Sequence, residues 1–191
     1  MCGIAGFVSL RRVAHPRGQR DLDVMSALVR HRGPDGDGTW LSKDNACGFA
    51  HRRLSIIDLS ARGSQPMSDD RGNTIVFNGE IYNHRELRTE CELKGFRFRS
   101  DSDTEVVLAL YAMYGNSCVD HLRGMFAFAI WNNESGELFA TRDRFGIKPF
   151  YFTVAGDIFY FASEAKSLLP FLSSIATDET ALTEYLTFQY Q

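Results

Sequence analysis

The chain opens with Met-Cys-Gly-Ile-Ala-Gly-Phe (Met1–Phe7), in which a cysteine directly follows the methionine and leads into an apolar run. Removal of Met1, which the small side chain at position 2 permits, would make Cys2 the first residue. That residue would then carry a thiol and a free α-amine with a pKa of roughly 7.7–8.0, so a useful fraction of the amine is unprotonated near neutral pH. In one interpretation, Cys2 carries both the nucleophile and the base of a catalytic site. The other is a small apolar residue that begins a buried strand, and these seven residues do not decide between them.

Helices and period-two strands continue from this opening in groups rather than in alternation. A Ser102/Glu105 capping box and an Asn83 cap with Glu86 predict two helix starts, and Asn78-Gly79 is first of all a turn signal at the end of a short strand. Segregated antiparallel hairpins with helices at both ends of the chain indicate a layered α+β fold. Strands are expected at 4–9, 38–41, 47–51, 74–77, 125–131, 137–141, 149–154 and 158–162, and helices at 21–32, 84–94, 102–115, 164–169 and 178–188.

Composition narrows the class of protein. A length of 191 residues suits one domain, and a net charge of −3 without a Lys/Arg-rich run argues against nucleic acid as the main partner. No apolar stretch reaches the ~18 residues of a membrane span, and no export signal is visible, so we expect a cytoplasmic protein. The four cysteines form no C-x-x-C pair and the five histidines show no ligand spacing, so no metal site is expected.

Three further clusters combine polar residues with turn or helix-end positions. The stretch 30–36 (RHRGPDG) suits a helix end followed by a turn, and Arg53 in the stretch 51–58 suits either a carboxylate ligand or a surface ion pair. Asn78 and Gly79 form a turn in one interpretation. In the other, the Asn side-chain amide and the Gly N–H are two adjacent donors for an oxyanion. Asp103 lies in the first turn of an expected helix, where the dipole favours an ionised carboxylate.

Taken together, these clusters resemble one family. The motifs are CGIAG (2–6), RHRGPDG (30–36), RLSIID (53–58), FNGEIYNH (77–84), SDTE (102–105), RGMFAFAIW (123–131), RDRFGIKPFYF (142–152) and FASEAKSL (161–168). In this order they are similar to the N-terminal glutaminase domain of glutamine-hydrolysing asparagine synthetases, a class II glutamine amidotransferase. The resemblance covers residues 2–190 and implies an N-terminal-nucleophile hydrolase fold, a four-layer αββα sandwich of two stacked antiparallel sheets between helical layers.

The resemblance also implies roles at the reaction centre. Cys2 would be the nucleophile and its own α-amine the general base. The side chain of Asn78 and the backbone N–H of Gly79 would form the oxyanion hole. The implied reaction is attack on the side-chain amide of glutamine, formation of a thioester, release of ammonia and hydrolysis to glutamate.

Substrate-holding residues follow from the same resemblance. Arg53 would bind the α-carboxylate of glutamine, and Glu80 and Asp103 its α-ammonium. A zwitterionic amino acid needs a cation at one end and an anion at the other, so this assignment agrees with the charges. The backbone of Leu54, Ser55, Ile56 and Ile57 would line the pocket.

Partners and cofactors complete the expectation. The glutaminase reaction would need no cofactor, whereas ATP and Mg²⁺ would act in a C-terminal synthetase domain that is absent here, because no Ser-Gly-Gly-x-Asp-Ser type loop occurs. The ammonia acceptor could be aspartate, or a sugar or other acceptor in an alternative amidotransferase, and a non-catalytic docking module with this fold is a further alternative. A homodimer is a possible assembly, and the sequence does not decide the oligomeric state. The helix at 178–188 is expected to pack against a following domain.

Overall fold

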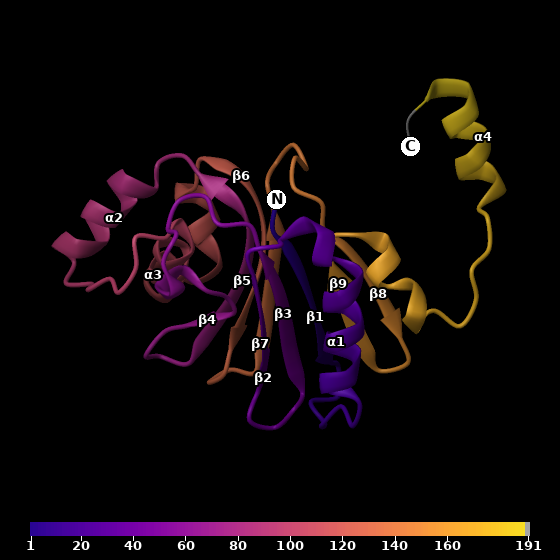
Figure 1. The fold of residues 1–191 in the computed structure, drawn as a ribbon, viewed down its shortest axis with the longest axis horizontal. Coiled ribbons are helices and arrows are strands. Elements are labelled where there is room, and N and C mark those ends of the chain that lie inside the picture. Colours follow the sequence, from indigo (N-terminus) through magenta and orange to yellow (C-terminus); the bar gives the residue numbers. More distant parts are fainter. Residues whose placement is uncertain (190–191) are drawn as a thin grey trace.

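Two antiparallel sheets stacked face to face form the centre of the molecule (Figure 1). The computed structural model describes residues 1–189. The first sheet has the order β2 (Gly36–Leu41), β3 (Cys47–Arg53), β1 (Gly3–Ser9), β9 (Ile158–Ala162) and β8 (Tyr151–Ala155). The second has the order β4 (Met67–Ser68), β5 (Asn73–Ile81), β6 (Gly124–Asn132) and β7 (Glu137–Arg142).

Three hydrophobic cores define four layers. The central core lies between the sheets and contains side chains from one face of most strands, for example Ile4 of β1 and Val76 of β5. The opposite face of the first sheet packs on α1 (Gly18–Leu28), where Phe7 meets Leu22. The outer face of the second sheet packs on α2 (His84–Leu93) and α3 (Asp103–Tyr114). Successive residues of a strand point to opposite faces, and here both faces are buried, so the inner strands are apolar over most of their length. The predicted αββα sandwich is therefore confirmed.

The first strand is held on both sides. Strand β1 pairs with β3 and with β9, both antiparallel, so that Gly3 lies opposite Arg52 and Ala5 lies between Ala50 and Ala162. Beyond the ladder, Ser163 Oγ accepts the N–H of Ile4 at 3.0 Å. The chain end that carries Cys2 is thus fixed by the centre of the sheet.

The strand that contains Asn78-Gly79 is longer than predicted, and the turn interpretation of this dipeptide is wrong. Strand β5 continues to Ile81 because β6 pairs with it along its whole length, with Gly79 opposite Phe126. A Cβ at Gly79 would lie 2.4 Å from Met125 O and 2.8 Å from Phe126 Cα, so the glycine allows a close backbone approach within the sheet.

The bounds of α1 and the capping of α2 differ from the prediction. The predicted helix 21–32 begins at Gly18 and ends at Leu28, and Arg30–Arg32 form a separate 3₁₀ turn. The spacing of apolar residues predicted the buried face of α1 correctly but not the residues at which the helix begins and ends. Asn83 does not cap α2, because its side chain donates to His121 O and accepts from Arg123 N.

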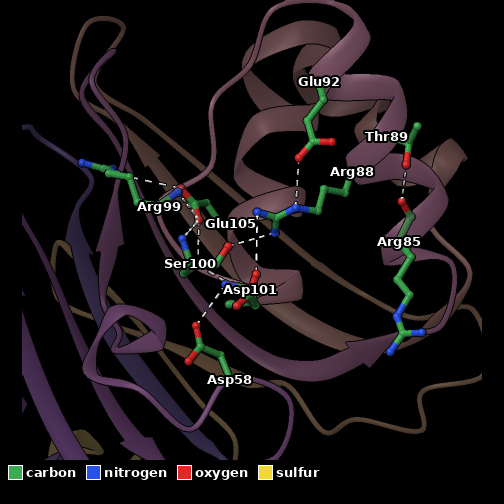
Figure 2. Close-up of polar contacts among 10 residues, drawn as sticks. Asp58, Arg85, Arg88, Thr89, Glu92, Arg99, Ser100, Asp101 and Glu105 are labelled. Atoms are coloured by element: carbon green, nitrogen blue, oxygen red, sulfur yellow. Dashed lines mark hydrogen bonds and ion pairs between the residues drawn. The ribbon is translucent and has the colours of Figure 1, made fainter.

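The second capping box is half formed. Ser102 Oγ accepts the N–H of Thr104, as predicted. The carboxylate of Glu105 instead accepts from the N–H and Oγ of Ser100 at 2.8 and 2.6 Å, and from Arg99 N–H (Figure 2). The turn before α3 is therefore anchored to the helix by Glu105.

The C-terminal third follows the prediction with local changes. Strand β8 starts at Tyr151 rather than Pro149. In place of the helix predicted at 164–169 there are two 3₁₀ turns, Ala165–Ser167 and Leu169–Phe171, because Pro170 cannot continue an α-helix. The helix predicted at 178–188 is α4 (Glu179–Phe188), capped by Asp178. It stands apart from the sandwich in Figure 1, and Leu182, Tyr185 and Leu186 are exposed. Among residues 1–189 no helix is long and apolar enough to span a membrane.

His51 joins the two sheets in a neutral form. Its Nε2 lies 3.3 Å from Phe77 O and its Nδ1 is buried without a partner among residues 1–189, which fits a ring with its proton on Nε2. Burial lowers the pKa of His51 to about 3. In the unfolded chain the pKa is about 6.5, so the unfolded state binds a proton in this window that the folded state does not.

We therefore expect the free energy of unfolding to decrease as the pH falls from about 6.5 to about 3, by about 1.4 kcal/mol per pH unit from this residue. His51→Gln keeps a neutral donor and should show a flatter dependence in urea titrations across this range. An identical pH dependence in the variant would contradict a neutral buried His51.

Candidate active site

One pocket lies where the start of β1, the end of β3, the end of β5 and the start of α3 meet. Every residue that the sequence predicted for the site lines it. These residues are Cys2, Arg53, Leu54, Ser55, Ile56, Ile57, Asn78, Gly79, Glu80 and Asp103. Gln65 and Lys148 line it as well and were not predicted.

The thiol of Cys2 is half-buried against the chain that follows β3. Its Sγ lies 3.5 Å from Leu54 O and accepts the N–H of Leu54 at 3.4 Å. Burial raises the pKa of this thiol, although the Leu54 N–H and Arg53 oppose the shift. A raised pKa keeps the sulfur protonated at neutral pH, so nucleophilic use of Cys2 requires a base that takes its proton.

Arg32 holds the backbone of Cys2, a contact that the sequence did not reveal. Its Nε donates to Cys2 O at 2.9 Å, and its Nη1 lies 3.1 Å from Glu164 Oε1. Burial raises the pKa of Glu164, but hydrogen bonds from Lys166, Arg32 and His31 outweigh it and the value falls to about 2. The sequence of the stretch 30–36 indicates a helix end, and only the fold brings this stretch beside β1.

Asn78 and Gly79 present donors to the pocket. Asn78 is 1% exposed, and its Nδ2 has no hydrogen-bond partner within the described chain. On the same strand the N–H groups of Phe77 and Ile81 point away from β6, to Gln65 Oε1 and Asp103 Oδ2. Because N–H directions alternate along an antiparallel strand, the N–H of Gly79 points to that side too. Two donors on adjacent residues suit a developing oxyanion.

Arg53 is held at the pocket by carbonyl groups of the loop that follows it. Its Nη1 donates to Ser60 O at 2.8 Å, and its Nη2 donates to Asp58 O. The Asp58 carboxylate in turn accepts from Ser60 N–H at 2.7 Å. It also accepts from Asp101 N–H at 3.0 Å, as Figure 2 shows. One loop thus fixes the guanidinium and reaches the turn that leads into Asp103.

Asp103 begins α3 and points back to β5. Its Oδ2 accepts the N–H of Ile81 at 3.0 Å, and the residue is 5% exposed. Burial raises the pKa of Asp103 more than its hydrogen bonds lower it, so burial opposes the effect expected of the helix dipole, and an ionised Asp103 stays a prediction. A cation brought to Asp103 would favour the ionised form. Glu80 is half-buried at the same pocket.

Gln65 connects strand β5, which carries Asn78, to the start of α3, which carries Asp103. Its Oε1 accepts Phe77 N–H at 2.6 Å, and its Nε2 donates to Thr104 Oγ1 at 3.1 Å. Its buried amide therefore ties the residue before Asn78 to the residue after Asp103. Within residues 1–189 no group of three or more His, Cys, Asp or Glu side chains is arranged to hold a metal ion.

Comparison with known proteins places this geometry in a family. A model of the glutamine amidotransferase domain matches residues 1–191. The chain belongs to the glutamine amidotransferase domain family. It is 48% identical over 192 residues to asparagine synthetase [glutamine-hydrolyzing] 1 of Bacillus subtilis, and 41% identical over 188 residues to asparagine synthetase [glutamine-hydrolyzing] 3 of the same organism. These alignments cover 100% and 96% of the chain but 30% of each relative.

A further relative and a solved structure are also similar to this chain. The chain is 40% identical over 185 residues to the amidase chry2 of Gibberella zeae, covering 90% of the chain and 27% of that protein. The structure of glutamine phosphoribosylpyrophosphate amidotransferase from B. subtilis matches with a TM-score of 0.75 at 20% identity, covering 87% of this chain and 43% of that one. At this identity the match concerns the fold alone. The chain is thus a glutamine amidotransferase domain similar to part of asparagine synthetases.

The contact between Arg32 and Cys2 O yields a prediction. Arg32→Ala should lower glutamine hydrolysis strongly with little change in the thermal midpoint, because the carbonyl of Cys2 loses its donor and the chain end becomes mobile. Glu164→Gln, which keeps Arg32 and an acceptor for it, is the matched control and should retain more activity. Equal losses in the two variants would show that the ion pair, rather than the bond to Cys2, matters.

Proposed function

We propose that the chain hydrolyses the side-chain amide of glutamine through a thioester on Cys2. The observation that carries this is the convergence of the Cys2 thiol, the unpartnered amide of Asn78 and two opposite charges, Arg53 and Asp103, at one pocket. A non-catalytic module would not require an unpaired buried donor, which costs stability.

Glutamine would bind by its two charged ends. The guanidinium of Arg53 would hold the α-carboxylate, and the carboxylates of Asp103 and Glu80 the α-ammonium. The raised pKa of Asp103 fits this role, because the incoming ammonium compensates the burial of its charge. The neutral amide end would then face Cys2 and the donors of Asn78 and Gly79.

In the proposed reaction, Cys2 acts as the N-terminal residue after removal of Met1. Its neutral α-amine accepts the thiol proton while Sγ forms a bond to the amide carbon, and the resulting oxyanion accepts from Asn78 Nδ2 and Gly79 N–H. The α-ammonium returns the proton to the leaving nitrogen as the C–N bond breaks, which releases ammonia. Water then adds to the thioester with the amine as base, and C–S cleavage gives glutamate and the free thiol.

The ammonia acceptor and its activation are proposed to lie outside these residues. The chain spans about 30% of the length of the asparagine synthetases that it matches, which supports a separate synthetase domain. There ATP and Mg²⁺ would activate a carboxylate, for which aspartate is favoured by the names of these relatives. The glutaminase step needs no cofactor in this proposal. The free thiols of all four cysteines suit a reducing, cytoplasmic compartment.

The nucleophile is tested by glutamate release from glutamine. A chain whose mass verifies the loss of Met1 should release glutamate, whereas Cys2→Ala should release none and keep its thermal midpoint, because the change is small and at the chain end. A chain that retains Met1 should be nearly inactive, because its Cys2 nitrogen is an amide. Full activity of the Met1-containing chain would contradict the α-amine as base.

The two ends of the substrate predict a kinetic split. Arg53→Ala should mainly raise KM, because Arg53 binds a group that does not react, and Asp103→Asn should behave likewise. Asn78→Ala should instead lower kcat by roughly 10²–10³, the typical loss of one oxyanion donor. Steady-state kinetics across glutamine concentrations separates these effects. A pure KM effect in Asn78→Ala would show that its amide binds the ground state only.

A further inference from the structure

No residue of the motif RDRFGIKP (142–149) takes part in the proposed reaction, and the structure shows which contacts this motif makes. The Asp143 carboxylate accepts the N–H of Phe126 at 3.2 Å, of Phe145 at 3.2 Å, of Ile147 at 2.9 Å and of Lys148 at 2.9 Å. Burial raises the pKa of Asp143, but these N–H groups outweigh it and keep the pKa below its usual range. The loop 143–148 is therefore fixed to strand β6 by one ionised side chain.

The rigid loop places Lys148 at the glutamine pocket. The residue is 5% exposed and lines the pocket together with Cys2 and Asn78. Its Nζ lies 3.2 Å from Met1 Sδ and forms no ion pair with a carboxylate in the described chain. A buried ammonium without a counterion is costly, and an apolar side chain of similar length would pack here at lower cost. Lys148 therefore needs an explanation other than stability.

The contact between Lys148 Nζ and Met1 Sδ places the lysine at the end of the pocket where Cys2 lies. Only five covalent bonds separate Met1 Sδ from the nitrogen of Cys2, and removal of Met1 takes away the side chain that Nζ contacts. The other charged side chains around Cys2 are either paired within the protein or assigned to a charged end of glutamine. Arg32 is paired with Glu164, and Arg53 and the acids Glu80 and Asp103 are assigned to the two ends of glutamine. Among residues 1–189, Lys148 lines this pocket as a cation for which neither a carboxylate partner nor a substrate group has been assigned.

We propose that Lys148 is a positioning residue that places a fixed positive charge beside the N-terminal residue of the processed chain and favours the neutral, proton-accepting form of the Cys2 α-amine. This rests on the proposed function, in which that amine is the base. Like charges disfavour one another at short range, so the ammonium of Lys148 makes protonation of the amine less favourable. A base that is largely neutral near pH 7 is available at the pH at which it works.

The test measures the amine without turnover. In a Cys2→Ser background, where no thiol competes, trace acetylation of the N-terminal amine by acetic anhydride is followed across pH by peptide mass spectrometry. Lys148→Met should raise the midpoint of this titration by about 1 pH unit, and Lys148→Arg should restore it, because a charge of the same sign returns. Lys43→Met removes an exposed lysine from the β2–β3 turn and should leave the midpoint unchanged.

A second readout uses the Cys2 chain with verified loss of Met1. The acidic limb of kcat/KM against pH should move to higher pH in Lys148→Gln and stay in place in Lys148→Arg. An unchanged amine midpoint in Lys148→Met, together with an unmoved acidic limb in Lys148→Gln, would overturn the role of Lys148, even if glutamine hydrolysis persists. Failure of the unsubstituted processed chain to hydrolyse glutamine would instead overturn the proposed function, whatever the amine titration shows.

Discussion

The pairing of β1 between β3 and β9 is the constraint on which the site depends. It puts the first residues of the chain in the middle of a sheet rather than at a mobile terminus, and Ser163 and Arg32 secure the backbone on either side of Gly3. A nucleophile at a free chain end would lose much of its effective concentration to motion. Here the sheet supplies the rigidity, and the thiol needs only a contact with Leu54 to be oriented.

The second sheet contributes the two hydrogen-bond donors, Asn78 and Gly79, at a point where β5 and β6 approach each other closely. Strand β5 carries Asn78 and Gly79 without a turn. On its partner β6, the backbone of Phe126 exchanges hydrogen bonds with Asp143, which holds the loop that presents Lys148. The central core between the sheets fixes the distance between β1 and β5. The same packing therefore sets both the stability of the sandwich and the relative position of nucleophile and oxyanion donors.

Much of this was predictable from local patterns. Alternating apolar residues located most strands, and the motifs in order gave the fold and all the expected pocket residues. The sequence failed where the outcome depends on a distant partner. Asn78-Gly79 has the sequence of a turn, but pairing with β6 keeps it in a strand. Asn83 has the position of a helix cap, but its side chain accepts the N–H of Arg123 instead. Asp103 starts a helix, and only the fold shows that it is buried. Arg32, Gln65 and Lys148 reach the site from other elements, so no local pattern indicates them.

The central claim is that Cys2, as a free N-terminal residue, forms the covalent intermediate. It is tested most directly by rapid acid quenching of the processed chain with glutamine, followed by mass spectrometry of the N-terminal peptide. The account predicts a glutamyl group on Cys2 that appears before free glutamate accumulates, is diminished in Asn78→Ala and is absent from the chain that retains Met1. Glutamate formed at the full rate with no adduct on Cys2 at any quench time, or an equal adduct in the Met1-containing chain, would contradict it.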